Sequence, residues 1–211
     1  HSTRRRQRQM CIRDRILITS IMFASCAVSP PSKTSNICDI YDEKRSWYRA
    51  SLRTEKKWGI APEVTMAFIK HESSYQQGAK PERTRIFFGL LPGKRKSTAY
   101  GYAQVTDGTW ESYKKATGYR FVSRRDFSDA VDFIGWYNDR SSKKLGIPKN
   151  NARLLYLAYH EGMNGYKKGS YRAKPWLLSV STNVQNTANM YSSQFEKCKK
   201  RLGSPFYFLF N

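Results

Sequence analysis

The apolar residues toward the C-terminus recur at helical spacing. They alternate steps of four and three, at Val184, Ala188, Tyr191, Phe195, Cys198 and Leu202. This period places them on one face of a single α-helix. An apolar face must be buried against other elements, so the pattern predicts a packed fold in which Cys198 faces the core.

More helices are predicted upstream, over residues 42–58, 62–72, 106–118, 123–146 and 150–161. Pro62 occupies a first helical position, and Val64, Phe68 and Glu72 follow it at steps of four on one face. The last three helices have alternative N-caps, namely Thr106 or Asp107, Ser123 or Asp126, and Asn150 or Asn151. Gly118, Gly146 and Gly162 are expected to end them. The chain is therefore expected to be mostly α.

The chain is strongly basic, with 38 Lys and Arg against 16 Asp and Glu and a formal charge of +22. Without residues 1–25, which hold six Arg and one Asp, the charge is still +17. Nucleic acid is one polyanion that such a surface attracts. However, the charges are scattered except at residues 94–96 and 197–201, and the chain has no zinc-ligand spacing, phosphate loop or RNA-binding signature. We expect no nucleic acid, metal or cofactor; an anionic cell wall or a merely soluble basic surface explains the charge as well.

The N-terminus has the pattern of an export signal. Arg13 and Arg15 precede an apolar run over residues 16–24, which is far shorter than the ~20 residues of a membrane-spanning helix. The chain does not begin with Met, and residues 1–9 are set aside, with Met10 as a candidate start. Residues 1–25 are therefore expected to be a signal peptide with a non-native extension.

A candidate lipid anchor follows the apolar run. Phe23-Ala24-Ser25-Cys26 resembles the bacterial lipobox, in which the cysteine receives diacylglycerol. Residues 26–37 contain a Ser/Pro-rich stretch typical of a tether. Ala27 in place of Asp implies sorting to the outer membrane, so we expect a periplasmic protein anchored through Cys26. A plain signal peptide with a chance cysteine is the alternative.

The two remaining cysteines of the expected mature chain, Cys38 and Cys198, lie near opposite ends of the folded region. Export would place them in an oxidising compartment, which predicts a disulfide between them. Closing so long a loop is worth on the order of 4–5 kcal/mol in the chain-entropy model. Two free buried thiols are the alternative.

Glu72 stands at the end of a run that is apolar at residues 67–69, and Ser73 follows it. Apolar surroundings raise the pKa of a carboxyl, so the group can hold a proton near neutrality, as a general acid for a glycosidic oxygen must. Ser73 is a candidate to orient that carboxyl. By itself, a Glu at a helix end is more often a solvated surface residue.

Three short segments, within residues about 60–170, resemble in order the motifs of the soluble lytic transglycosylase family. His71-Glu72-Ser73-Ser74-Tyr75 resembles its Glu-Ser motif. Ala99-Tyr100-Gly101-Tyr102-Ala103-Gln104-Val105 resembles Gly-Leu-Met-Gln, with Gly101 and Gln104 in register. Leu157-Ala158-Tyr159-His160-Glu161-Gly162 resembles Ala-Tyr-Asn-Ala-Gly.

The resemblance implies a mostly α domain of the lysozyme-like α+β superfamily over residues 38–211, with two helical lobes and a central groove. It implies that Glu72 protonates the oxygen between N-acetylmuramic acid and N-acetylglucosamine in peptidoglycan glycan strands. Glu72 then takes the proton of the muramic C6 hydroxyl, which closes a 1,6-anhydro ring. No enzyme nucleophile is needed, because the N-acetyl group of the substrate stabilises the cationic centre. A monomer is expected.

The resemblance also implies roles for other residues. Gln104 would hydrogen-bond substrate, and the Tyr159 phenol would lie near the catalytic carboxyl, although Tyr159 alone fits a core aromatic equally well. Tyr100 and Tyr102 would offer faces for sugar stacking. The full expected substrate-binding set is Ser73, Tyr100, Gly101, Tyr102, Gln104, Tyr159, His160 and Glu161.

The sequence departs from the family at three places. Tyr102-Ala103 replaces Leu-Met, and His160-Glu161 replaces Asn-Ala. Residues 77–99 resemble an insertion, Gly/Pro/Lys-rich and without helical period, whose Ile86-Phe87-Phe88 is expected to be a small strand or a flap. Its Lys and Arg residues would engage peptide stems or acidic wall polymers, or belong to a solvated loop.

Three rival functions remain from the sequence. A Glu161 lying across the sugar from Glu72 would permit ordinary hydrolysis, so a muramidase acting on the same bond is one. A wall-binding lipoprotein or inhibitor without enzyme activity is another. Nucleic-acid binding rests on charge alone, and the export signal argues against it.

Overall fold

The computed structural model describes residues 28–86, 91–95 and 97–204. Within these ranges the chain forms seven α-helices, one 3-10 helix and two strands: α1 (Ile37–Glu43), α2 (Arg45–Trp58), α3 (Pro62–Ser73), β1 (Arg83–Ile86), β2 (Leu91–Arg95), α4 (Asp107–Thr117), α5 (Phe127–Leu145), α6 (Ala152–Lys168), η1 (Ser170–Ala173) and α7 (Pro175–Leu202). The expected signal peptide and Cys26 lie outside the described residues. The mostly helical fold class predicted from the sequence is confirmed.

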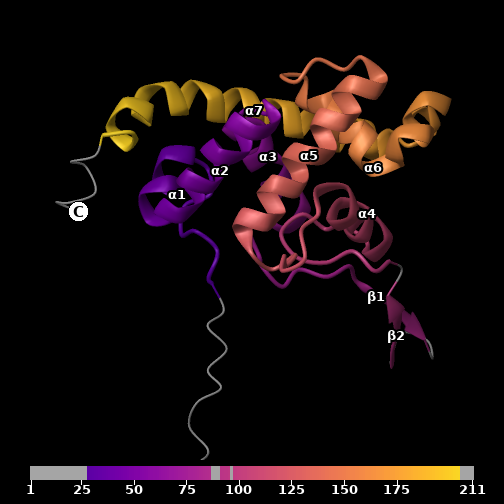
Figure 1. Cartoon of the computed structure of the whole chain (residues 1–211). Coiled ribbons are helices and arrows are strands. Elements are labelled where there is room, and N and C mark those ends of the chain that lie inside the picture. Colours follow the sequence, from indigo (N-terminus) through magenta and orange to yellow (C-terminus); the bar gives the residue numbers. More distant parts are fainter. Residues whose placement is uncertain (1–27, 87–90, 96, 205–211) are drawn as a thin grey trace, which may run out of the picture.

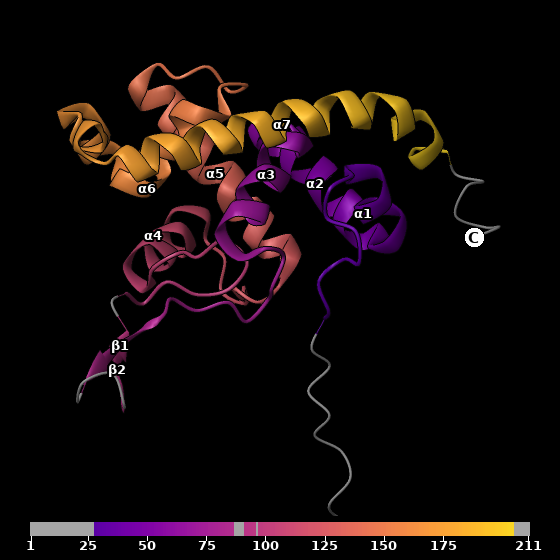
Figure 2. The same cartoon turned by 180° about the vertical axis from the view of Figure 1, so that it is seen from behind.

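The long helix α7 crosses the molecule and packs against α1, α3 and α6 (Figures 1 and 2). Helix α5 packs against both α2 and α6. The hairpin β1–β2 projects away from the helical body beside α4 (Figure 1). None of the helices in the described ranges combines the length and apolarity needed to cross a membrane.

Helix α7 forms as its apolar period predicts. All six residues of the pattern are buried, Cys198 among them. The helix begins earlier than the pattern, with Pro175 in its first turn, and its last turn carries Lys199, Lys200 and Arg201. Cations at this end interact favourably with the helix dipole.

Capping residues set several helix starts. Asp126 accepts a hydrogen bond from the Asp129 N–H at the start of α5, and Asn151 accepts one from Leu154 at the start of α6. Each was one of the two caps predicted there. The expected helix over residues 42–58 is instead divided, because the backbone at Lys44 is not helical (φ −120°, ψ 68°).

The break predicted at Gly162 is present, but the helix resumes after it. Gly162 has φ 70° and ψ 158°, a conformation that residues with a side chain rarely adopt. The backbone bends there, and the helical path continues to Lys168. The segment 163–168 therefore takes a new direction beside the end of the third motif.

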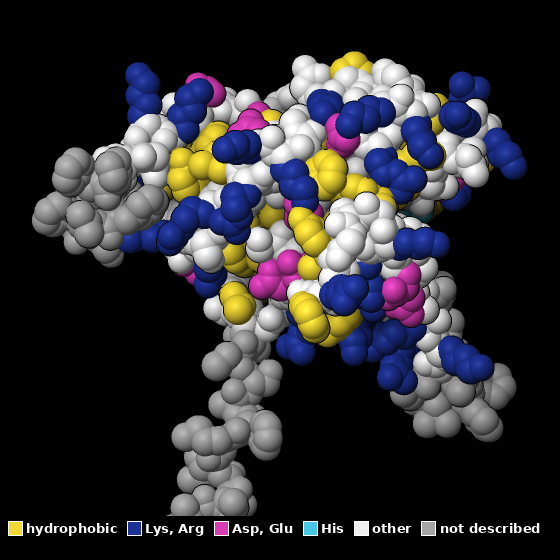
Figure 3. All heavy atoms as spheres, viewed as in Figure 1, with side chains coloured by type: hydrophobic (Ala, Val, Ile, Leu, Met, Phe, Trp, Pro, Cys, Tyr) yellow, Lys and Arg dark blue, Asp and Glu magenta, His cyan; other side chains and the backbone are white. Residues whose placement is uncertain are grey.

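Within the expected insertion, strands β1 and β2 pair antiparallel, with Arg83 opposite Arg95 and Ile86 opposite Leu91. The small strand expected at residues 86–88 is represented by Ile86, the last residue of β1; residues 87 and 88 lie outside the described part. Figure 3 shows Lys and Arg side chains scattered over the face it presents, rather than gathered on one element.

The second half of the expected tether packs on the domain. The backbone N–H and the hydroxyl of Ser32 both donate to the Glu43 carboxylate, each at 2.8 Å. The Tyr191 hydroxyl donates to the Thr34 carbonyl. Asn36 caps α1 through the Cys38 N–H. Residues 32–36 are thus docked against α1 and α7, which a free tether would not be.

Cys38 and Cys198 form the predicted disulfide, with their Cα atoms 6.1 Å apart. It joins α1 to the last turns of α7 across 160 positions of sequence. The bond therefore closes nearly the whole described domain into one loop.

We expect the double variant Cys38→Ser/Cys198→Ser to lose roughly 4 kcal/mol of unfolding free energy, because its unfolded chain is no longer constrained by the closed loop. Urea denaturation with and without a reducing agent measures the loss. Reduction of the wild type should lower its stability to that of the variant. An unchanged denaturation midpoint would contradict the structural role assigned to this bond.

Candidate active site

The side chain of Glu72 lines a pocket of about 560 Å³. Helix α3 contributes Glu72, the segment leading into α4 contributes Gln104, and α6 contributes Tyr159, His160 and Glu161. These five residues come from all three motifs that resemble the transglycosylase family. The fold therefore brings the three motifs to one cavity.

Helix α3 ends at Ser73, one residue after Glu72, in a turn of unusual backbone conformation. Ser74 and Tyr75 both have positive φ, 50° and 63°, which costs residues with a side chain on the order of 1 kcal/mol or more each. The turn is held by Tyr75, which is fully buried. Its hydroxyl donates to the Met66 carbonyl at 3.2 Å and lies 3.0 Å from the Tyr191 hydroxyl on α7. This packing fixes the end of α3 that carries Glu72.

The environment of Glu72 favours its protonated form. Burial raises the pKa of this carboxyl to about 7, and a hydrogen bond from the Tyr156 hydroxyl opposes part of that rise. A carboxyl with a pKa near 7 is protonated in a large fraction of molecules at neutral pH, yet it also ionises readily. One group of this kind is able to donate a proton and later accept one.

Tyr156 is the phenol that hydrogen-bonds Glu72, and the sequence analysis did not single it out. The residue expected near the carboxyl, Tyr159, lines the same pocket, but its hydroxyl donates to the Ala103 carbonyl at 2.6 Å. Both rings pack edge-on against Phe68 of α3, at centroid distances of 5.3 and 5.4 Å. The spacing of three residues on one helix face was the signal that could have identified Tyr156.

Gly101 and Gln104 form a tight turn at the pocket. Gly101 has φ 78°, and a Cβ atom there would lie 2.0 Å from the Arg124 carbonyl oxygen, so only glycine fits. Gln104 also has a positive φ, 45°. Its side-chain Nε2 donates to the carbonyls of Ala79 and Gly101 at 2.9 and 2.8 Å. These two bonds orient the amide, and a hydrogen bond from substrate would be accepted by Oε1.

Four of the predicted substrate contacts are not supported. Tyr102 is 1% exposed and packs against Trp47 and Phe127, so its ring cannot stack on a sugar. The Ser73 hydroxyl donates to the Ile69 carbonyl at 3.1 Å, and it does not orient the Glu72 carboxyl. Gly101 and Tyr100 are not among the residues lining the pocket. Cations from Lys80 and Arg124 lie over the Tyr100 ring instead.

Glu161 lines the pocket but is tied to other groups. Its carboxylate accepts hydrogen bonds from Lys174 Nζ at 2.6 Å and from the Ser170 hydroxyl, and it lies 3.0 Å from His160 Nδ1. Burial would raise its pKa, but the bonds from Lys174, Ser170 and His160 outweigh it and lower the pKa to about 2. Glu161 is therefore ionised at neutral pH and already paired.

An exposed aromatic side chain stands at the edge of this pocket. The ring of His160 packs edge-on against Trp176 of α7, with centroids 5.0 Å apart. Trp176 is 55% exposed, whereas most tryptophans of the chain are buried. Among the described residues, no group of His, Cys, Asp and Glu side chains is arranged to hold a metal ion.

The comparison with protein families agrees with this geometry. A family model described as "Transglycosylase SLT domain" matches residues 15–198, which span most of the chain. The chain belongs to this family of transglycosylase SLT domains, which indicates a lytic transglycosylase of peptidoglycan. Searches of curated proteins and of solved structures found no match.

The raised pKa of Glu72 predicts how stability depends on pH. Its folded pKa, about 7, exceeds the ordinary value of 4.5, so the folded state binds more protons between these values. Stability from this group is present below pH 4.5 and falls as the pH rises through 7, by about 3 kcal/mol in total. The side chain in Glu72→Gln does not titrate. Between pH 4 and pH 8, the free energy of unfolding of this variant should therefore rise relative to that of the wild type by about 3 kcal/mol. Denaturation at several pH values measures it.

The variant Tyr156→Phe provides the control for this titration. It removes the hydrogen bond that lowers the pKa of Glu72, so the fall in stability should extend to higher pH than in the wild type. A parallel pH dependence of wild type and Glu72→Gln would show that Glu72 does not titrate near neutrality.

Proposed function

We propose that this protein cleaves the β-1,4 bond between N-acetylmuramic acid and N-acetylglucosamine and leaves 1,6-anhydro ends. The protonated Glu72 gives its proton to the glycosidic oxygen as the bond to the muramic C1 breaks. The resulting carboxylate takes the proton of the C6 hydroxyl, whose oxygen bonds to C1. The carboxyl is then protonated again, and no water is consumed.

One observation carries the proposal: the two carboxyl groups of the groove have opposite environments. Glu72 has a pKa of about 7, and Glu161 one of about 2 with its oxygens occupied by Lys174, Ser170 and His160. Two-carboxylate glycosidases need a second carboxylate that acts as nucleophile or as base toward water. Glu161 is poorly suited to either role because its charge is already neutralised. This favours a single acid/base over a muramidase.

The ends of the released products distinguish a lytic transglycosylase from a muramidase. We expect wild-type protein to release muropeptides with 1,6-anhydro ends from purified peptidoglycan, as read by mass spectrometry. Glu72→Gln should slow cleavage by about 100- to 10,000-fold, the usual contribution of a general acid/base. Glu161→Gln is the matched variant, since it makes the same chemical change in the same pocket, and it should retain the anhydro product.

Other outcomes assign a rival function. Products with reducing ends only, together with equal losses in the two variants, would identify a muramidase. Absence of cleavage by the folded wild type would leave a wall-binding protein without enzyme activity.

We also propose that the mature chain is a lipoprotein, anchored through Cys26 to the outer membrane and facing the periplasm. The lipobox-like residues 23–26 and the apolar run before them support the anchor. The disulfide between Cys38 and Cys198 is compatible with an oxidising compartment.

Metabolic labelling with a fatty-acid analogue tests the anchor. We expect the wild type to be labelled and membrane-bound, and Cys26→Ser to be unlabelled and released by osmotic shock. Cys11→Ser is the control because it removes the other N-terminal cysteine and should change nothing. Label retained in Cys26→Ser would contradict the anchor.

A further inference from the structure

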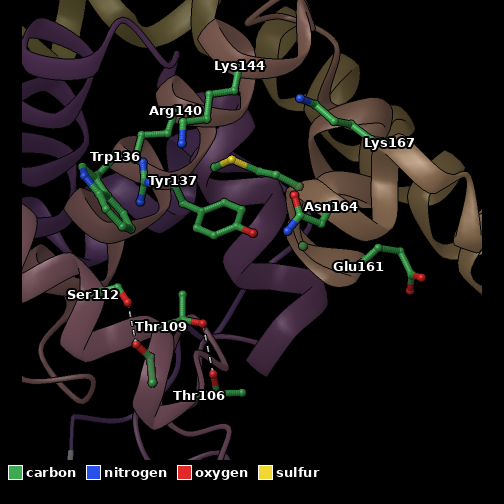
Figure 4. Close-up of a pocket in the computed structure, with 13 residues that line it drawn as sticks. Thr106, Thr109, Ser112, Trp136, Tyr137, Arg140, Lys144, Glu161, Asn164 and Lys167 are labelled. Atoms are coloured by element: carbon green, nitrogen blue, oxygen red, sulfur yellow. Dashed lines mark hydrogen bonds between the residues drawn. The ribbon is translucent and has the colours of Figure 1, made fainter.

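A second pocket, of about 590 Å³, adjoins the one that holds Glu72 (Figure 4). The two share five lining residues: Thr106, Thr109, Tyr137, Glu161 and Gly162. They therefore form one continuous groove. The second pocket lies between α5, the resumed part of α6 after Gly162, and the first turns of α4.

Three cations line this second pocket. Arg140 and Lys144 come from α5 and Lys167 from α6, whose side chain extends toward α5 (Figure 4). Within the described part of the chain, none of the three forms an ion pair with a carboxylate. Positive groups that converge on a cavity without an anion raise the local concentration of a negatively charged ligand.

Other cations near this pocket form ion pairs with a carboxylate, in contrast to the three that line it. Asp139 binds Lys143 at 2.6 Å and Lys149 at 2.7 Å, so the adjacent Lys143 is neutralised while Lys144 is not. The one carboxylate in the lining is that of Glu161. It is held by Lys174, and in Figure 4 it points away from Tyr137 and the pocket.

Arg140 is held in position by an aromatic ring. Its guanidinium lies 4.6 Å from the centroid of Trp136, which is buried. Stacking on a ring leaves the guanidinium edge available for a carboxylate, which it can bind through two hydrogen bonds. Ser112 and Asn164 add polar groups to the same lining.

We propose that this second pocket, the basic subsite, binds the carboxylates of the peptide stem carried by muramic acid. The inference rests on the proposed function, since it assumes a glycan strand in the pocket of Glu72. A stem is attached to the sugar itself, so its carboxylates reach only a site continuous with the glycan groove. The basic subsite meets this requirement, and its unpaired cations match the charge.

The test compares two forms of one substrate. Glycan strands with intact stems carry free carboxylates, and conversion of these to carboxamides removes the charge but keeps the length and the peptide. The readout is the ratio of kcat/KM on the carboxylate strands to that on the carboxamide strands. We expect Lys144→Met/Lys167→Met to lower this ratio about tenfold, the effect of losing two partly exposed ion pairs.

The matched control is Arg153→Met/Lys168→Met, which removes two positive charges from exposed positions of α6 outside the pocket. Its ratio should equal that of the wild type. If both double variants keep the wild-type ratio, or if the ratio falls by the same factor in both, the basic subsite is overturned. General attraction between a basic protein and an acidic strand would then suffice.

Binding keeps this test separate from catalysis. Each double variant is combined with Glu72→Gln, and dissociation constants are measured for the carboxylate strands and for the carboxamide strands. The ratio of these two constants replaces the ratio of kcat/KM values. Discrimination there supports the subsite even if no strand is cleaved. Polyglycerol phosphate is the competing ligand: if it binds in a Lys144- and Lys167-dependent way while the two strand forms bind alike, the site serves a wall polymer and the stem proposal fails.

Discussion

Helix α3 holds Glu72 between two other helices, and this packing positions the chemistry of the whole site. On the α7 side, His71 Nε2 lies 3.0 Å from Thr187 Oγ1, and the Tyr75 hydroxyl lies 3.0 Å from that of Tyr191. On the α6 side, Phe68 packs against Tyr156 and Tyr159. The disulfide secures the far end of α7 to α1. The place of the carboxyl therefore depends on long-range packing, because α3 alone has no means of fixing its own orientation.

The two glutamates of the groove differ in pKa because they have different hydrogen-bond partners. Burial raises the pKa of Glu72 to about 7, and the hydrogen bond from the Tyr156 phenol offsets only part of that rise. Burial acts on Glu161 as well, but Lys174 and Ser170 bond to its carboxylate and its pKa falls to about 2. Where environments separate the pKa values of two carboxyl groups in this way, the carboxyl that retains its proton is the candidate acid. In the proposed mechanism, a second carboxylate in the third motif therefore need not change the reaction.

The bend at Gly162 lies where the pocket of Glu72 meets the basic subsite. The positive φ of Gly162 redirects α6 directly after Glu161, and the resumed helix presents Lys167 toward α5. Glycine is suited to this position because a side chain would strain the backbone there. The excess positive charge of the chain is scattered over the surface, but in this pocket it is concentrated and unpaired. Under the proposal, local recognition of a stem carboxylate is distinct from general attraction between a basic protein and an acidic wall.

Local patterns in the sequence determined several helices of this protein and several residues of its candidate site. The period of four and three identified α7 and the buried face that carries Cys198, and the three motifs identified Glu72, Gln104 and Tyr159, which line one pocket. The caps at Asp126 and Asn151 were also predictable, since a cap acts within one turn. Only the tertiary structure decided that Tyr156 bonds Glu72, that Tyr102 is buried, that residues 32–36 dock on the domain and that Lys174 neutralises Glu161. The physical reason is that helical period and capping depend on neighbours within a few residues, whereas burial, pKa and ion pairing depend on groups that folding brings together from distant parts of the chain.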